Sequence, residues 1–172
     1  MDANERRAHS WRTALFEREL IDYPSISGKY NYRDPWNSAS NLVVAAPRHS
    51  WLLACPCDRQ PKAAHTSYVV VVGANTLFPP DRAFPLSELP EGCDPIVLLE
   101  IAGDEVLWTE PRDLHIDELP AAMRGEGPGL RLSRTRHGGF RYITIGGEYG
   151  ELPLDTSPKE LRRLCEIPVA DE

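Results

Sequence analysis

Sixteen prolines and twelve glycines divide this chain of 172 residues into many short segments. Proline has no backbone N–H and fixes φ, and glycine weakens helices and strands, so both residues interrupt regular elements. Here they fall mostly between apolar runs, which indicates many short elements joined by turns, without an internal repeat or a disordered linker. A chain of this size buries about 70% of its unfolded surface. We therefore expect a single domain over residues 1–172.

The charge balance limits the classes of partner. Nineteen Lys and Arg residues stand against 26 Asp and Glu residues, a formal net charge of -7, which opposes binding to phosphate backbones and makes nucleic acid an unexpected partner. No apolar run approaches the roughly 20 residues that cross a bilayer, and the opening MDANERRAHSWR has no apolar core of a secretion signal. We therefore expect no membrane segment in this chain, and a cytoplasmic location by default.

The four cysteines give little support to a metal site or a disulfide framework. They are too few for a disulfide-built scaffold, and Cys55 and Cys57 are separated by one residue, whereas paired zinc ligands usually have about two to four between them. His65 lies near this pair in sequence. We favour free thiols that pack as small apolar groups, also for Cys93 and Cys165. The expectation is that the protein has no metal and no other cofactor.

Two apolar runs are the best strand candidates. The run Tyr68–Gly73 (YVVVVG) is continuous and β-branched, as in strands covered on both faces, and predicts a central strand. The run Ile96–Ala102 (IVLLEIA) is interrupted only by Glu100. Two residues, Gly103 and Asp104, separate it from Glu105–Thr109, a spacing that predicts a tight type II′ hairpin. A shorter strand candidate spans Trp51–Cys55.

A second hairpin is predicted near the end of the chain. Phe140–Ile145 is a strand candidate, and Gly146-Gly147 supplies two residues that can adopt the positive φ of a type I′ turn. A polar, glycine-rich loop precedes it, through Gly125, Gly127 and Gly129.

Helices are predicted at both ends of the chain. The first runs from about Ser10, a possible N-cap, to Tyr23, where Pro24 ends it. Residues 24–50 then carry turn-forming Asn, Asp and Ser and predict a mostly irregular connection. At the other end Ser157, Pro158 and Glu160 occupy the N-cap, N1 and N3 positions of a capping box. The side chains expected to dock this short helix are Leu161, Leu164 and Cys165.

These elements together predict an α+β fold. An antiparallel β-sheet made of hairpins is expected to pack against the N-terminal helix, with a short C-terminal helix at its end.

Several segments in one order resemble a bacterial pilin-like family called domain of unknown function 1559. They cover about His9 to Leu152, which makes residues 9–152 the family-like head and residues 153–172 a C-terminal tail. The segments are HSWRTALFERELIDY, YNYRDPWNSASN, ACPCD, TSYVVVVGANTLFP, IVLLEIAGDEVLWTEPRDL and HGGFRYITIGGE.

The resemblance implies the globular head of a type II pseudopilin. Such a head is ordinarily exported and joined to an N-terminal prepilin segment and a long membrane helix; we expect this chain to lack both. The family's late His is followed by Asp-Gly, whereas His137 here is followed by Gly146-Gly147. The turn chemistry is thus retained without the carboxylate, so we interpret that position as structural.

The segment after the second apolar run carries the densest group of candidate site residues. Arg112 could hold a ligand carboxylate while Trp108 offers an apolar or stacking face, with Glu110 and Asp113 beside them. The structural interpretation, which we favour, pairs Arg112 with Glu110, Asp113 or Glu100 and places Trp108 in the core.

His137 is the remaining candidate in this site. An imidazole titrates near neutral pH, so it could act as a general base or ligand beside the carboxylates. No nucleophile with an adjacent base and no metal-ligand spacing accompanies it, and we favour a structural role.

The aromatic loop is a further binding candidate. Its rings among amides could form a stacking platform for a sugar or peptide, although such rings more commonly pin an irregular segment to a core. The residues are Tyr30, Asn31, Tyr32, Trp36 and Asn37.

Two functions follow as hypotheses. The leading one is a non-enzymatic, pseudopilin-like head that mediates protein assembly or surface interaction. The alternative is a small-ligand-binding or hydrolytic domain that uses Glu100, Glu110, Arg112 and His137, and it requires that these side chains meet in a concave site.

Overall fold

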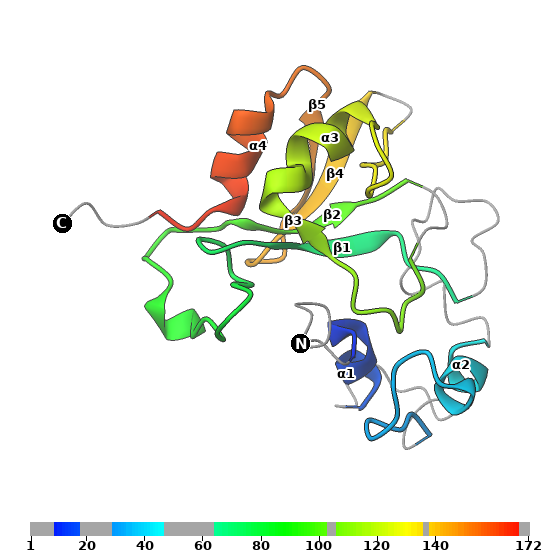
Figure 1. Cartoon of the computed structure of the whole chain (residues 1–172). Helices are drawn as coiled ribbons and strands as arrows, with labels where there is room; N and C mark the ends of the chain where they lie inside the picture. The colour runs from blue at the N-terminus through cyan, green and yellow to red at the C-terminus, as the bar shows by residue number, and fades with distance from the viewer. Residues whose placement is uncertain (1–8, 18–28, 47–63, 103–105, 136–137, 169–172) are drawn as a thin grey trace. The chain divides into compact units, whose positions relative to one another are not determined.

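The computed structural model describes residues 9–17, 29–46, 64–102, 106–135 and 138–168 (Figure 1). The chain divides into two compact units. Unit 1 comprises Met1–Ser67 and Asp104–Arg112, and unit 2 comprises Tyr68–Gly103 and Asp113–Glu172. The expectation of one domain over the whole chain stays a prediction.

Unit 2 contains a five-stranded sheet with the order β3-β1-β2-β4-β5. Neighbouring strands are antiparallel except for β1 and β3, which are parallel. Together with four short α-helices in the described residues, this confirms the α+β class with a mostly antiparallel sheet. The strands are β1 (Tyr68–Val72), β2 (Ile96–Glu100), β3 (Leu114–His115), β4 (Gly139–Thr144) and β5 (Tyr149–Pro153).

The two apolar runs predicted as strands form the interior of this sheet. Val69 and Leu99 lie opposite each other on β1 and β2, and both are completely buried. Each of the two strands has a neighbour on both sides, as their continuous apolar sequences predicted. The middle position belongs to β2.

The first predicted hairpin is wrong. β2 pairs with β1 on one side and with β4 on the other, so Glu105–Thr109 is not its partner. Leu107 instead forms an antiparallel bridge with His65 in unit 1. Gly103 and Asp104 lie outside the described residues. The local turn signal was overridden because β2 pairs with a strand on each side, β1 and β4, which leaves no edge for Glu105–Thr109.

The second predicted hairpin is confirmed, with a different turn. β4 and β5 pair in register from Gly139↔Pro153 to Ile143↔Tyr149. Of the two glycines at the corner only Gly147 has a positive φ, 86°. Thr144 donates its N–H to Glu148 O at 2.9 Å and accepts the N–H of Gly147 at 3.0 Å. This is a three-residue connection with one left-handed glycine, whereas a type I′ turn needs two.

Unit 2 also carries two short α-helices and two 3₁₀ turns. The C-terminal helix is confirmed: Ser157 Oγ accepts the N–H of Glu160 at 3.1 Å, Pro158 is the first helical residue, and Leu161 and Cys165 are buried. The helix contacts α3 and β2. The elements are η3 (Leu86–Glu88), η4 (Ile116–Glu118), α3 (Leu119–Arg124) and α4 (Pro158–Cys165).

Unit 1 contains helices α1 (Trp11–Glu17) and α2 (Ala39–Ala45). Ser10 Oγ accepts the N–H of Arg12 at 3.2 Å, as an N-cap does. Residues 24–50 were expected to be mostly irregular; the described part, residues 29–46, also contains α2, which Ser38 caps by accepting the N–H of Asn41. The predicted end of the first helix, Pro24, and the strand candidate Trp51–Cys55 lie outside the described residues.

None of the helices in the described ranges combines the length and the hydrophobicity needed to cross a membrane.

Candidate functional site

Trp108 is part of the core of unit 1. Its side chain is completely buried, and its indole Nε1 donates to the carbonyl oxygen of Ala45 at 3.2 Å. Its backbone N–H donates to Ala64 O at 2.8 Å. Ala45 is the last residue of α2, where helix carbonyls have no partner within the helix. The ring thus caps α2 and offers no open stacking face, in line with the structural interpretation.

Glu110 and Arg112 are half-buried residues of the same unit. Glu110 accepts the N–H of Leu107 on its carboxylate at 3.4 Å, and its carbonyl accepts Arg12 Nη1 at 3.5 Å. None of the three predicted ion pairs of Arg112, with Glu110, Asp113 or Glu100, is formed. Within the part of the chain that the structure describes, Arg112 has neither an ion pair nor a hydrogen-bonding partner for its side chain.

Asp113 and Glu100 belong to unit 2, and both carboxylates bind sheet residues. Asp113 Oδ1 accepts the N–H of Val70 at 3.2 Å, directly beside the pairing of β3 with β1, so this side chain extends the ladder. Glu100 is 2% exposed and pairs with Arg141 Nη1 at 3.4 Å. His137 lies outside the described residues. The described site residues are therefore divided between the two units, with Trp108, Glu110 and Arg112 in unit 1 and Glu100 and Asp113 in unit 2.

The aromatic loop contains a contact that sequence reasoning missed. His9 Nδ1 lies 3.0 Å from the hydroxyl of Tyr30, and His9 Nε2 donates to the carbonyl oxygen of Tyr32 at 3.0 Å. The three rings meet edge to face, with centroids 4.9 to 5.6 Å apart. Tyr30 is buried, so this ring pins the loop. The only sequence signal was a His next to the helix start, far from the two tyrosines.

Burial raises the pKa of Tyr30 to about 12, and the nearby Tyr32 adds to the shift. The unfolded chain ionises this phenol near pH 10, so between about pH 10 and 12 the unfolded state binds fewer protons than the native state. Stability therefore falls as pH rises through this window. We expect Tyr30→Phe to remove part of this alkaline loss, as measured by denaturant unfolding at several pH values, whereas Tyr149→Phe on the exposed β5 leaves it unchanged.

Asn41, in the first turn of α2, holds the loop that precedes this helix. Its side chain is completely buried. Oδ1 accepts the N–H of Asn31 at 2.8 Å, and Nδ2 donates to the carbonyls of Asn31 and Pro35, each at 3.0 Å. The arrangement favours loop tethering over a stacking platform for this segment, although Tyr32 keeps an exposed ring.

Replacing Asn41 with alanine tests this role. The backbone groups of Asn31 and Pro35 lose three part-buried hydrogen bonds to this side chain, which costs about 1–3 kcal/mol of unfolding free energy. Asn37→Ala, an exposed position in the same loop, is the control and should change stability by less than about 0.5 kcal/mol. Urea unfolding followed by tryptophan fluorescence measures both. Equal stability of the two variants would refute the role of Asn41.

The described cysteines do not form a metal site. Cys93 is half-buried and Cys165 is buried, and both are free thiols. Burial raises the pKa of Cys165 to about 12, with Glu166 adding to the shift, so this thiol stays protonated. The ranges that the structure describes hold no group of three metal-ligating side chains. Cys55 and Cys57 lie outside them.

Strand β5 is an edge strand of the sheet in unit 2. Thr144 N–H bonds to Glu148 O, and hydrogen bonding alternates along an antiparallel pair, so Gly150 and Leu152 direct their backbone groups to β4. Tyr149 and Glu151 direct theirs away from the sheet. The ring of Tyr149 is 56% exposed, and Leu154, just beyond the strand, is 45% exposed.

The side chains on β5 leave this edge accessible. Glu151 folds back over Gly139, where its Oε1 accepts from Thr135 Oγ1 at 2.7 Å. Its carboxylate is therefore engaged away from the edge. A Cβ on Gly150 would overlap the ring of Tyr142, which lies directly opposite on β4. Pro153 closes the strand, and its carbonyl accepts the N–H of Thr156 at 3.1 Å.

The comparisons with known proteins give no relative from which a function could be transferred. The resemblance to the pilin-like family therefore depends on the sequence segments quoted above, and it stays a prediction. Neither the family models, nor the curated proteins, nor the solved structures include a match to this chain.

Proposed function

We propose that this chain is a non-enzymatic, pseudopilin-like head that binds a protein partner along the free edge of β5. The proposal depends on one observation: the backbone groups of Tyr149 and Glu151 are directed away from the sheet. The side chains of Tyr149 and Leu154, at the same edge, are exposed. An extended segment of a partner can add to such an edge through main-chain hydrogen bonds, and side chains on the exposed face supply specificity.

Edge strands are usually protected, which makes an accessible edge informative. Proteins commonly place charges or proline on such strands because a free ladder invites pairing with other chains. On β5 the proline is confined to the last position, and the carboxylate of Glu151 is bound to Thr135. The N–H groups at positions 149 and 151 are directed away from β4, toward the edge of the sheet.

The sequence resemblance supports the finer part of the proposal. In a pilin-like head the N-terminal helix packs against the antiparallel sheet, and we extend this arrangement to the helix that begins at Trp11. In this proposal the whole chain acts as one head. The family-like segments of residues 9–152 are the support for this extension.

Photo-crosslinking tests where a partner binds. A benzoylphenylalanine at position 149 should crosslink a protein in cells of the source organism, and the same group at position 159, on the exposed face of α4, should not. The crosslinked protein is then identified and purified. Equal crosslinking from both positions would contradict the proposed surface.

The affinity of the purified partner gives the quantitative test. Tyr149→Ser and Leu154→Ser should each weaken binding about tenfold or more, as expected for side chains central to an interface. Leu86→Ser is the matched control, since Leu86 is a leucine of the same unit and 62% exposed. Equal affinities for Leu154→Ser and Leu86→Ser would refute the proposal.

The unpaired state of Arg112 favours the second hypothesis, a ligand-binding or hydrolytic role with Glu100, Glu110, Arg112 and His137. In this alternative the guanidinium binds a substrate carboxylate. A purified chain that hydrolyses carboxylate-bearing esters should then lose this activity on Arg112→Gln and keep it on Arg163→Gln, an exposed arginine on α4. Absence of hydrolysis by the wild-type chain would exclude the hydrolytic form of this alternative.

A further inference from the structure

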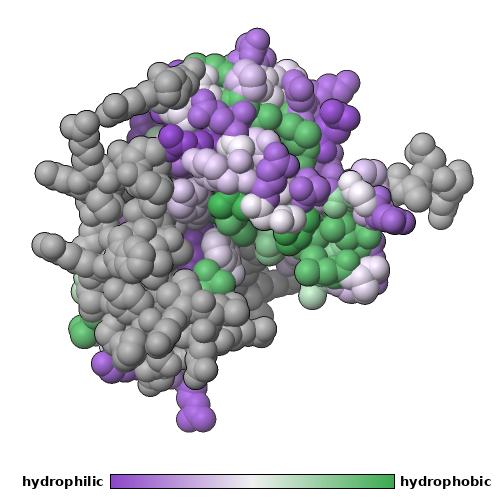
Figure 2. All heavy atoms as spheres, turned by 180° about the vertical axis from the view of Figure 1, so that it is seen from behind, coloured by the Kyte–Doolittle hydropathy of each residue, from purple (hydrophilic) through white to green (hydrophobic). Residues whose placement is uncertain are grey.

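Unit 2 has a surface pocket with a volume of about 280 Å³. Three segments line it: residues 74–76 after β1, residues 82–90 around η3, and residues 167–168 after α4. Figure 2 shows hydrophobic residues gathered on the surface at the right of that view, among polar ones. None of the pocket residues belongs to β5, so the pocket is a separate feature from the proposed protein-binding edge.

The walls of the pocket are fixed by hydrogen bonds and by core packing. Ile167 N–H donates to Asn75 O at 2.7 Å, which joins the end of the C-terminal segment to the loop after β1. Thr76 Oγ1 donates to Gly73 O at 3.0 Å and accepts the N–H of Phe78 at 3.1 Å. Ile167 also belongs to a buried cluster of the unit 2 core. The pocket is therefore formed before any ligand binds.

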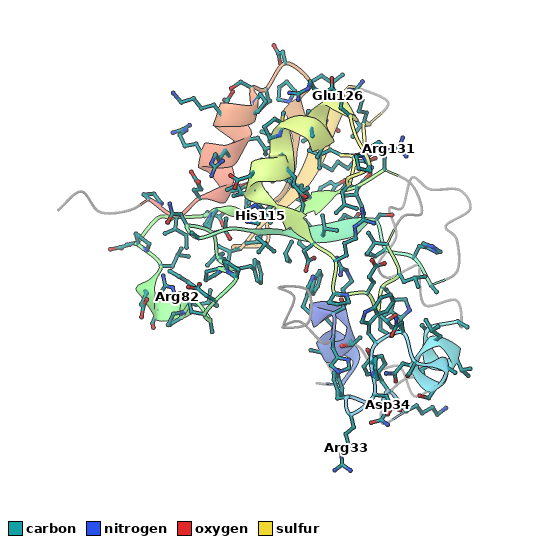
Figure 3. All side chains as sticks on the ribbon, viewed as in Figure 1. Arg33, Asp34, Arg82, His115, Glu126 and Arg131 are labelled. Carbon is teal, nitrogen blue, oxygen red and sulfur yellow. The ribbon has the colours of Figure 1, made fainter. Side chains whose placement is uncertain are left out.

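Two opposite charges face this pocket without pairing. Arg82 and Glu88 both line it, and within the described ranges they form no ion pair with each other or with any other side chain. The guanidinium of Arg82 lies 5.8 Å from the centre of the Phe84 ring (Figure 3). Apolar surface from Phe84 and Ile167 completes the lining. The lining of the pocket thus combines one cation, one anion and an apolar surface.

We propose that this pocket binds a small zwitterion with an apolar body, of the chemical class of an α-amino acid with an aliphatic or aromatic side chain. Its carboxylate binds the guanidinium of Arg82, Glu88 accepts its ammonium group, and its side chain packs on Phe84 and Ile167. The pocket volume of about 280 Å³ lies just below the roughly 300–1,000 Å³ range of ligand pockets, which favours a small ligand.

The net charge of the chain favours a zwitterion over a simple carboxylate. At -7 the protein repels an anion at long range, whereas a ligand with no net charge is not repelled. Because both charged side chains are exposed, each contributes little, and a dissociation constant on the order of 1 mM is expected.

Titration of the full chain with L-leucine, followed by amide chemical shifts, tests the proposal. Leucine should shift resonances of residues 74–76 and 167–168. N-acetyl-leucine lacks the ammonium group and leucinamide lacks the carboxylate, and each should bind at least several-fold more weakly. Saturable binding of leucine with weaker binding of both analogues supports the site; equal binding of all three compounds, or no binding of leucine at several times 1 mM, overturns it.

Two variants assign the charges. Arg82→Gln should weaken leucine binding several-fold without changing the affinity for leucinamide, which has no carboxylate. Glu88→Gln should weaken leucine binding several-fold without changing the affinity for N-acetyl-leucine, which has no ammonium group. Arg163→Gln and Glu91→Gln, exposed positions outside the pocket, are matched controls and should bind leucine as the wild type does. Equal losses in the variants and in their controls would overturn the assignment.

Discussion

Trp108→Ala is expected to lower the free energy of unfolding by about 3–5 kcal/mol. The ring is completely buried in unit 1, and its removal leaves a cavity that the surrounding residues fill only in part. It also leaves the carbonyl of Ala45, at the C-terminal end of α2, without the indole N–H. Urea unfolding measured by circular dichroism gives the value.

Trp108→Phe separates the two contributions of this residue. Phenylalanine retains much of the apolar volume and loses the hydrogen bond to Ala45, so we expect a cost between that of the alanine variant and zero. Tyr149→Ala, at an exposed residue of β5, is the control for removal of an aromatic side chain. A cost of less than about 1 kcal/mol for Trp108→Ala would contradict its place in the core.

The second large effect is expected at Arg141. Arg141→Met removes the partner of Glu100, whose side chain is 2% exposed, and so leaves a buried carboxylate without its nearest cation. Breaking a buried ion pair in this way costs about 3–5 kcal/mol. The measurement is denaturant unfolding at neutral pH.

The double variant Glu100→Leu/Arg141→Met provides the decisive comparison. With both charges replaced by apolar groups no uncompensated charge is left, so its stability should return toward that of the wild type. Arg124→Met is the control, since Arg124 pairs with Glu126 on the exposed surface and its loss should cost less than about 1 kcal/mol. A double variant as unstable as Arg141→Met would show that Glu100 does not depend on Arg141.

The strands that could be predicted from the sequence are those with continuous apolar residues, because such residues indicate by themselves that both faces of the strand are buried. The β-branched run at 68–72 and the apolar run at 96–100 are interior strands, because apolar side chains on both faces require cover on both faces. The N-cap at Ser157 was also predictable, because the residues that form it, Ser157, Pro158 and Glu160, lie within four positions of one another in the sequence.

Elements that depend on distant contacts were not predictable. Strand β3 has two residues and exists through its pairing with β1, and α2 is a helix of seven residues in a segment rich in turn formers. The first hairpin was predicted from Gly103-Asp104 alone, whereas strand pairing depends on the whole sheet. The turn after β4 was correct in place and wrong in type because glycine permits several turn types.

The candidate site was predicted in part. The burial of Trp108 agrees with the structural interpretation, but Arg112 forms none of the three expected pairs, with Glu110, Asp113 or Glu100. Sequence spacing does not determine which of several carboxylates an arginine reaches. The contacts of His9 with Tyr30 and Tyr32 join residues 21 and 23 positions apart and had no local signal.

Hydrogen exchange of the β5 amides tests most directly whether the edge of the sheet is a binding surface. In the free protein the amides of Gly150 and Leu152 should exchange slowly because they bond to β4, and those of Tyr149 and Glu151 should exchange fast. Addition of the crosslinked partner should slow Tyr149 and Glu151 strongly and leave Gly150 and Leu152 nearly unchanged. Fast exchange at Tyr149 and Glu151 in the complex would contradict strand addition at this edge.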